Sequence, residues 1–403
     1  MKIPARLSFE TLGGALLCLW IALGLSGCSN TTTYKTTAIT PLVQEANEIP
    51  ESLLLDVGIQ LFDPGLEAAN ESRDSVIFPE IRKAESRFIP HMLMETLQTS
   101  ASCGAIRIIP NTLSAPDVVV TGKILQSDGE ALKVSVTVND ASGKTWYTRT
   151  YDGLASRYAY DPRKNIHSDP FQDVYNRMAN DLLTYQRSLS NAEILAVRTI
   201  AELKFANAFS PQAFDGLIRQ DAKGYYQINR LPAEGDPMLD RIRAIRERDY
   251  LFVDTLQDYY GAFVKDMSIP YKQWRSQSYD EVIALREIKK DARNRTIAGV
   301  AAILGGIAAA GGNNRATRTA GQVSVGAGGY LIKSGFDKRA EAKMHIEALQ
   351  ELGDSLQSEI EPQVIELEDR TITLSGTVEN QYDQWRDVLK DLYNLETGET
   401  QNR

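Results

Sequence analysis

The chain has 403 residues, a formal net charge of −9 and three cysteines. Because an acidic chain lacks the basic surface that nucleic acids require, we expect no nucleic-acid partner. Three cysteines are too few for a disulfide-stabilised scaffold, so stability has to come from hydrophobic cores, and the length is sufficient for two or three domains.

The first 27 residues have the pattern of a secretory signal. Lys2 and Arg6 precede an apolar core from Leu12 to Leu25. This core is shorter than the about 20 apolar residues that a membrane-spanning helix needs. We therefore predict a cleaved signal over residues 1–27, with a short N-terminal membrane helix as the alternative.

The signal ends in Leu25-Ser26-Gly27-Cys28. This motif resembles the lipobox of bacterial lipoproteins, in which the cysteine is acylated and the signal is cut before it. The resemblance implies that Cys28 carries the lipid, and several acyl chains would hold the protein on a membrane because each buried methylene contributes about 0.8 kcal/mol. Ser29 stands where Asp favours inner-membrane retention, so the resemblance implies the outer membrane, with the protein facing the periplasm.

A tether and an α+β domain are expected next. Residues 28–52 are rich in threonine and lack periodicity, which predicts a flexible tether. Residues 53–160 predict an α+β domain. Its expected elements are a strand at 53–63, a helix at 81–97 kinked at Pro90, a strand at 104–110 and three antiparallel strands across 117–153.

This order of elements, with "VVVTGKI" leading into "VTVNDASGKTWYTRTY", resembles a recurrent domain of the bacterial envelope. It is similar to the N-terminal domain of the Tol-system propeller protein and to parts of the curli-secretion and flagellum-associated lipoproteins. The resemblance implies a module that binds other proteins or assembles and is not itself an enzyme. Any other α+β domain with a three-stranded meander is the alternative.

Residues 161–295 predict a mainly helical domain. Helices are expected at 171–189, 191–209 and 236–267, the last with Asp236 as N-cap and Pro237 at its first position. The apolar face of this last helix comprises Leu239, Ile242, Ile245, Phe252, Leu256, Tyr259, Phe263 and Met267. A short hairpin is expected through Lys223 and Gly224.

The same region is rich in aromatic residues, which form either a core or a surface for a glycan or protein. The residues concerned are Tyr225, Tyr226, Tyr250, Tyr259, Tyr260, Tyr271 and Trp274. At helical spacing the core interpretation is favoured.

Residues 296–335 are rich in glycine and alanine and predict a helical hairpin that turns at 311–314. The residues expected at its helix-packing stripes are Ala298, Ala302, Gly306, Ala310, Ala320, Ser324 and Gly328. Small residues every four positions let helix backbones approach closely. The segment resembles the glycine zippers of some envelope lipoproteins and membrane-inserting proteins. We expect packing within or between subunits; a membrane-inserted hairpin and a flexible linker are the alternatives.

Residues 336–403 predict a helix, a β-hairpin that turns at 368–370, and a final helix. The strand "TITLSGTV" resembles the small BON domain, which implies attachment to a membrane or protein. That family closes with another strand after the helix, and residues 395–403 offer none.

Few residues suggest chemistry. His167 adjoins Ser168 and Asp169, but triad members meet through folding, so we interpret these as loop residues. His91 and Glu95 share a helix face without a third ligand, so no metal site is predicted. The sequence has no phosphate-binding or dinucleotide-binding glycine motif, and no cofactor is expected. After signal cleavage, Cys103 has no disulfide partner and reads as a buried thiol.

Taken together, these patterns predict an α+β protein anchored in the outer membrane through its N-terminal lipid. We expect a structural, assembly or protein-binding role without catalysis, with an envelope protein or a second copy as the partner. The alternative is a periplasmic hydrolase of peptidoglycan or polysaccharide, which would need two carboxylates about 5–10 Å apart.

Overall fold

The computed structural model describes residues 37–67, 79–110, 115–161, 163–164, 168–309, 363–367 and 370–397. All of these belong to one structural unit, which spans residues 36–403. Cys28, Ser29, the signal segment and the predicted packing residues Ala310, Ala320, Ser324 and Gly328 lie outside the described residues.

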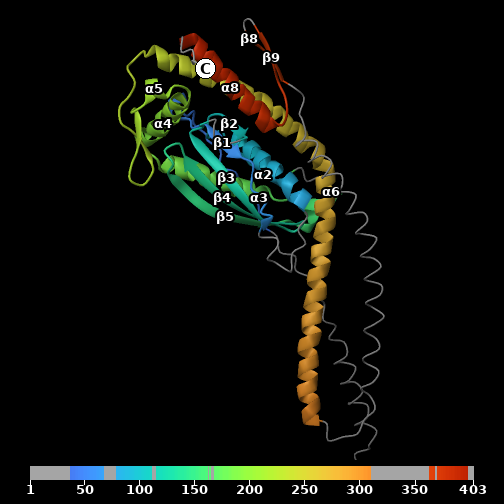
Figure 1. The fold of residues 1–403 in the computed structure, drawn as a ribbon. Coiled ribbons are helices and arrows are strands. Elements are labelled where there is room, and N and C mark those ends of the chain that lie inside the picture. Colours follow the sequence, from blue (N-terminus) through green and yellow to red (C-terminus); the bar gives the residue numbers. More distant parts are fainter. Residues whose placement is uncertain are drawn as a thin grey trace, which may run out of the picture. The chain divides into compact units, whose positions relative to one another are not determined.

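A mixed five-stranded sheet forms the centre of the fold (Figure 1). Its strands are β1 (Val57–Gln60), β2 (Ile106–Ile109), β3 (Val118–Ser127), β4 (Ala131–Asp140) and β5 (Thr145–Leu154). The strand order is β2-β1-β3-β4-β5, and β1 is parallel to both of its neighbours while the other pairs are antiparallel. Sheet and helices together make this an α+β protein, as predicted.

Two helices, α2 (Pro79–Ser100) and α3 (Gln172–Ser188), pack against one face of this sheet (Figure 1). Alternate residues of β4 supply that face, and Leu132, Val134 and Val136 are buried there because successive side chains of a strand point to opposite sides. The predicted order of strand, helix and four strands is therefore confirmed. The helix α2 runs through Pro90.

The first strand is much shorter than predicted. Residues Glu51–Leu53 form a 3-10 turn, η1, and β1 ends at Gln60. Just after it, Phe62 donates its N–H to the Ser86 carbonyl (2.9 Å), and its ring covers Gly122. The regular pairing of β1 is interrupted at Phe62, and Asp63 then forms an isolated parallel bridge with Lys123 of β3.

The predicted tether is fixed to the fold from residue 37 onward. We call residues 37–45 the strap. Thr37 bonds to Leu154 at the end of β5, and Thr40 N–H donates to Asp173 of α3 (2.7 Å). The expectation of a flexible segment up to residue 52 is thus wrong for the strap, because side chains of α3 bind its backbone.

The helices α4 (Asn191–Phe209) and α5 (Pro211–Phe214) follow α3. A capping box between Ser190 and Glu193 begins α4. The predicted hairpin through residues 223–224 is confirmed by β6 (Ile218–Gln220) and β7 (Tyr226–Ile228).

The longest element is α6 (Pro237–Ala309), a helix of 73 residues. Asp236 accepts a hydrogen bond from the Met238 N–H (2.9 Å), which confirms the predicted N-cap. Seven of the eight predicted apolar-face residues are buried, and Tyr259 is half-buried against the core. The helix runs past its expected end at 267 and without a break across residues 295 and 296.

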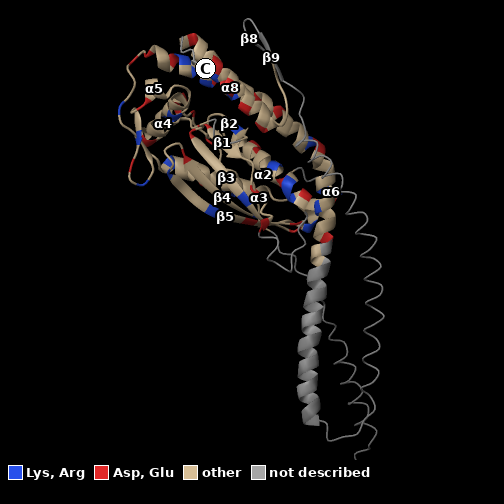
Figure 2. Ribbon diagram, viewed as in Figure 1, with Lys and Arg blue, Asp and Glu red and all other residues tan. Residues whose placement is uncertain are grey.

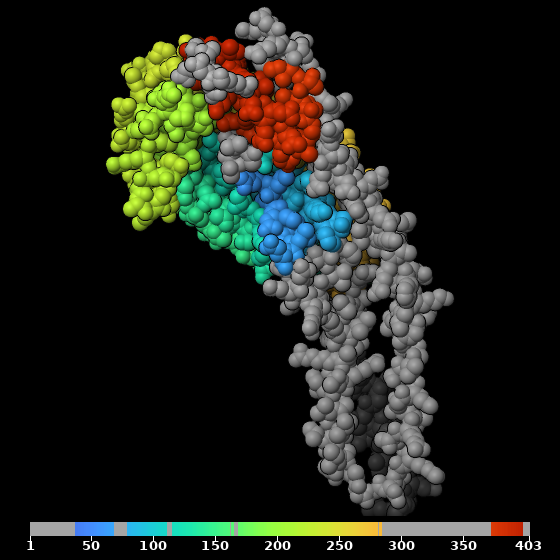
Figure 3. All heavy atoms as spheres, viewed as in Figure 1, coloured from blue at the N-terminus to red at the C-terminus, as the bar shows by residue number. Residues whose placement is uncertain are grey.

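The C-terminal hairpin and helix form as predicted. The strands are β8 (Gln363–Leu367) and β9 (Arg370–Leu374), and the helix is α8 (Val378–Thr397). The helix α8 packs on α6 through a stacked pair, Phe252 and Trp385, whose ring centroids are 5.2 Å apart. In Figure 3, α8 (red) lies at the surface beside the yellow-green residues of α4 and α5.

One hydrophobic core joins the sheet, α2, α3, α4, α6 and α8. The predicted domain boundary between 160 and 161 falls within this shared core. Acidic and basic positions are both present along the described parts of the helices (Figure 2). In the part of the chain that the structure describes, no helix is both long and apolar enough to cross a membrane.

Candidate functional site

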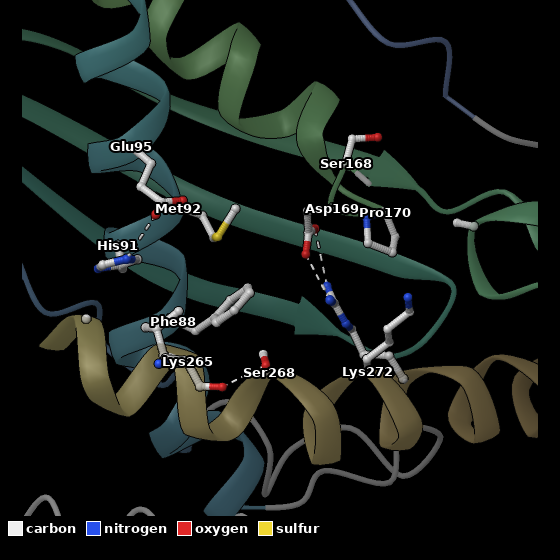
Figure 4. Close-up of a pocket in the computed structure, with 14 residues that line it drawn as sticks. Phe88, His91, Met92, Glu95, Ser168, Asp169, Pro170, Lys265, Ser268 and Lys272 are labelled. Atoms are coloured by element: carbon white, nitrogen blue, oxygen red, sulfur yellow. Dashed lines mark hydrogen bonds and ion pairs between the residues drawn. The ribbon is translucent and has the colours of Figure 1, made fainter. Parts of the chain in front are cut away.

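A groove of about 360 Å³ lies between α2 and α6 and is the candidate site (Figure 4). Phe88, Met92 and Glu95 line it from α2 at positions i, i+4 and i+7, which share one helix face. Lining residues of α6 begin at Gly261 and recur at three- and four-residue spacing up to Arg275. One face of α2, one face of α6 and the loop residues Ser168, Asp169 and Pro170 therefore form its walls (Figure 4).

The end of the groove is fixed by a buried ion pair. Arg275 of α6 donates two hydrogen bonds to Asp169 (2.8 and 3.2 Å), and both side chains are about 95% buried. Burial opposes the charge on Arg275, but attraction to Asp169 raises its pKa above the ordinary value. Asp169 also accepts from the Phe171 N–H (2.9 Å), so the pair connects α6 to the start of α3.

A second buried carboxylate, Glu85, sits where α2 meets α6 and β3. It accepts hydrogen bonds from Ser127 and from the Tyr271 hydroxyl (2.8 Å). Burial raises the pKa of Glu85, while nearby Arg82 counteracts this. Glu85 is fully buried, so its carboxyl and the two hydroxyls that bind it are enclosed between α2 and α6 and no carboxyl is exposed at that point.

His91 and Glu95 form the remaining polar pair of the groove. His91 Nε2 lies 3.3 Å from Glu95 Oε1, and the hydrogen bond from His91 lowers the pKa of Glu95. A metal site would need further ligands. Among the described residues, no group of three or more His, Cys, Asp or Glu side chains lies close enough together to hold a metal ion.

The groove contains two carboxylates, Glu95 and Asp169, but each is bound to a basic side chain. A glycosidase of the predicted alternative class needs one carboxylic acid whose pKa is raised, so that it can protonate the leaving group. The pKa of Glu95 is lowered instead, and Asp169 is held by Arg275. The groove therefore offers no observation that favours the hydrolase.

Two other buried aspartates, Asp249 of α6 and Asp117 just before β3, have raised pKa values. Asp249 accepts from the Tyr382 hydroxyl of α8 (3.2 Å) and lies 3.6 Å from Arg386, and burial raises its pKa to about 6. Asp117 accepts from the Asp56 N–H (2.9 Å), and burial raises its pKa to about 6 as well. Both carboxyls sit at contacts between elements and outside the groove.

The structure places the sequence-derived candidates as follows. His167 lies outside the described residues, and Asp169 is occupied by Arg275, so the adjacency of Ser168 and Asp169 indicates no triad. Helix α6 includes three of the predicted packing residues, Ala298, Ala302 and Gly306. The other packing candidates lie outside the described residues.

Cys103 is half-buried against the core and not fully buried as predicted, and the aromatic residues mostly follow the core interpretation. Burial raises the pKa of Cys103 to about 11, so it stays a thiol. Tyr260, Tyr271 and Trp274 are buried in the core, whereas Tyr225 is 37% exposed beside the turn between β6 and β7. The aromatic set does not form one surface.

Sequence reasoning missed the basic side of the groove. Lys265 and Lys272 follow Gly261 at spacings of four and eleven residues, which places all three on one face of α6. The glycine inside "YYGAFV" was the available signal, because glycine is unfavourable within a helix.

Three comparisons, with protein-family models, curated proteins and solved structures, found no match to this chain.

Proposed function

We propose that this protein is a lipoprotein, anchored through Cys28 in the outer membrane and facing the periplasm, whose folded part binds another protein of the envelope or a second copy. Its role is structural or in assembly. The lipobox-like motif supports the anchor, and the strap on α3 is the observation that carries the proposal.

The strap would connect an anchor directly to the hydrophobic core. Asn176 and Asn180 of α3 donate to the Thr40 and Pro41 carbonyls (2.7 and 3.0 Å), and Asn180 also accepts from the Val43 N–H (2.8 Å). A fold held on a membrane by its N-terminus benefits when the first ordered residues are bound by several hydrogen bonds, because force on the anchor is then shared among them.

The polar interior favours a scaffold over a catalyst. The buried acidic groups Glu85, Asp169 and Asp249 each bind a basic or hydroxyl side chain of another element. These contacts join α6 to α2, α3 and α8. They would hold a binding surface rigid for a partner.

Metabolic labelling with an alkyne-tagged palmitate tests the anchor. We expect the wild-type chain to be labelled and to sediment with outer membranes, and Cys28→Ala to lose both properties. Cys18→Ala, inside the predicted signal, is the matched control and should keep both. Labelling of Cys28→Ala equal to wild type would contradict the anchor.

Crosslinking in cells tests the binding role. An amber-encoded photocrosslinker placed on exposed positions of α6 and α8 should give discrete products of higher mass that contain this chain and an envelope protein or a second copy. Absence of any such product from both helices would contradict the binding role, while leaving the labelling result intact.

A further inference from the structure

Two lysines of the groove have no partner among the described residues. Lys265 and Lys272 are exposed, and no carboxylate of the described chain lies within ion-pair distance of either. The two carboxylates of the groove are occupied, Glu95 by His91 and Asp169 by Arg275. Among the described residues that line the groove, three lysine and arginine side chains therefore face two carboxylates, in a chain whose net charge is −9.

An apolar wall lies beside these lysines. Phe88, Met92 and Val264 contribute it, and the Phe88 ring is held edge-on against Tyr271, with centroids 4.9 Å apart. A fixed ring and an adaptable methionine together suit the insertion of an apolar side chain. Unpaired cations next to such a wall favour a ligand that is both acidic and apolar.

Gly261 keeps the groove open. A glycine within a helix costs about 1 kcal/mol relative to alanine. Packing does not require it here, because a Cβ at this position would lie 3.9 Å from the nearest atom, His91 Cε1. A larger side chain at position 261 would instead extend into the groove, so the glycine preserves space that no described residue fills.

The shape of the groove indicates the kind of ligand. Its lining on α6 runs from Gly261 to Arg275, about 21 Å along the helix axis at 1.5 Å per residue. Lys265 and Lys272 are separated by about 10 Å on the same scale. A peptide in the polyproline II conformation rises about 3.1 Å per residue with three residues per turn, so side chains three residues apart share one face at about 9 Å. Carboxylates at this spacing would match the two lysines.

We propose that the α2–α6 groove binds an acidic peptide segment in which two carboxylates, three residues apart, pair with Lys265 and Lys272 while an apolar side chain between them contacts Phe88 and Met92. This inference rests on the proposed protein-binding function and names the chemistry of the partner. It does not depend on the lipid anchor.

Fluorescence anisotropy on the full chain in mild detergent tests this. The probe is a fluorescein-labelled peptide, Gly-Glu-Leu-Phe-Glu-Gly. We expect it to bind about tenfold or more tightly than the peptide with lysine in place of both glutamates, and to weaken as salt is raised, since exposed charges are screened.

Three variants locate the site. The double change Lys265→Glu with Lys272→Glu should weaken binding by about tenfold or more, because attraction becomes repulsion. Arg219→Glu with Lys223→Glu, both at exposed positions of the β6–β7 hairpin, is the charge-matched control and should bind like wild type. Gly261→Val should weaken binding similarly without lowering Tm, because valine has the better helix propensity.

Equal affinity for the acidic and basic peptides would overturn the proposal, as would unchanged binding by the double lysine variant. Binding of decanoate but of neither peptide would assign the groove to a small amphiphile and would also overturn it. None of these results affects the labelling of Cys28, so failure of the groove and failure of the anchor are distinguishable.

Discussion

At the scale of single residues, Asp117 and Asp249 make stability depend on pH. Burial raises the pKa of both to about 6, from an ordinary value of 3.8. Between these two values the folded chain binds more protons than the unfolded chain, so the free energy of unfolding falls as pH rises through the window. Their contribution is fully present below about pH 4 and is lost above about pH 6.

Asp249→Asn should reduce this dependence. Asparagine is uncharged at every pH and can still accept from the Tyr382 hydroxyl, although Arg386, Arg246 and Arg107 lose a nearby negative charge. We expect the fall in unfolding free energy between pH 5 and pH 7 to shrink by about 1 kcal/mol, as measured by urea unfolding.

The control for this prediction is Asp266→Asn, which changes an exposed aspartate on the same helix. It should show the wild-type pH dependence. A fall for Asp249→Asn as large as that of wild type would mean that the carboxyl is already ionised at pH 5 in the folded protein.

Gly129 is required by a close approach of backbones. A Cβ there would lie 2.0 Å from the Arg275 carbonyl oxygen and 2.2 Å from the Tyr279 nitrogen, so Gly129→Ala forces the β3–β4 turn away from α6. We expect a loss of about 2–4 kcal/mol of unfolding free energy. Gly261→Ala, where space exists, should instead be neutral or add up to about 1 kcal/mol. Thermal unfolding of both variants checks this, and equal Tm values would contradict it.

The sequence hardly indicates which individual acidic residues are buried and paired in the fold. The chain has 53 acidic residues, and nothing in the local sequence distinguishes Asp249 or Asp169 from the exposed ones. Their burial arises from contacts with residues more than 100 positions away, such as Arg275 and Tyr382. Gly261 is the exception, because a glycine within a helical pattern can be recognised from the sequence.

At the scale of elements, α6 closes one edge of the sheet. The Gln257 side chain accepts from the Ile108 N–H (2.8 Å) and donates to the Ile108 carbonyl (2.9 Å), so it occupies the place of a neighbouring strand on β2. Arg107 beside it pairs with Asp254 of α6 (2.6 Å). An unpaired strand edge invites aggregation, and this contact blocks it.

Gln257→Leu should therefore leave both backbone groups of Ile108 unsatisfied. We expect a loss of about 2–4 kcal/mol of unfolding free energy, faster hydrogen exchange at the Ile108 amide and a greater tendency to aggregate. Gln273→Leu, at an exposed site on the same helix, is the matched control. Unchanged exchange at Ile108 would show that this contact does not protect the edge.

Elements with a strong period were predictable, and those defined by distant contacts were not. The apolar face from Leu239 to Met267 identified the start of α6 correctly because its spacing is helical. The change to alanine and glycine near residue 296 suggested a boundary, yet helix propensity continues through alanine. The strap was missed because its partner Asp173 is 133 positions away from Thr40.

At the scale of the whole molecule, the strap limits how far the fold can lie from the lipid that we propose on Cys28. Eight residues, 29–36, separate that cysteine from Thr37. Even a fully extended chain of this length spans only about 30 Å. A fold attached so closely would meet its partners near the same membrane.

Releasing the strap should lengthen this connection and expose it to protease. Asn176→Ala with Asn180→Ala removes three hydrogen bonds to the strap, each contributing about 1 kcal/mol. For the full chain in lipid vesicles, we expect proteinase K to cut within the strap, residues 37–45, about tenfold or more faster, because cleavage follows local opening. Thr184→Ala on α3, whose hydroxyl bonds within the helix, should be cut like wild type. Sedimentation of the vesicles before proteolysis tests the anchor separately. Equal cleavage rates for wild type and both variants would mean that these asparagines do not hold the strap on α3.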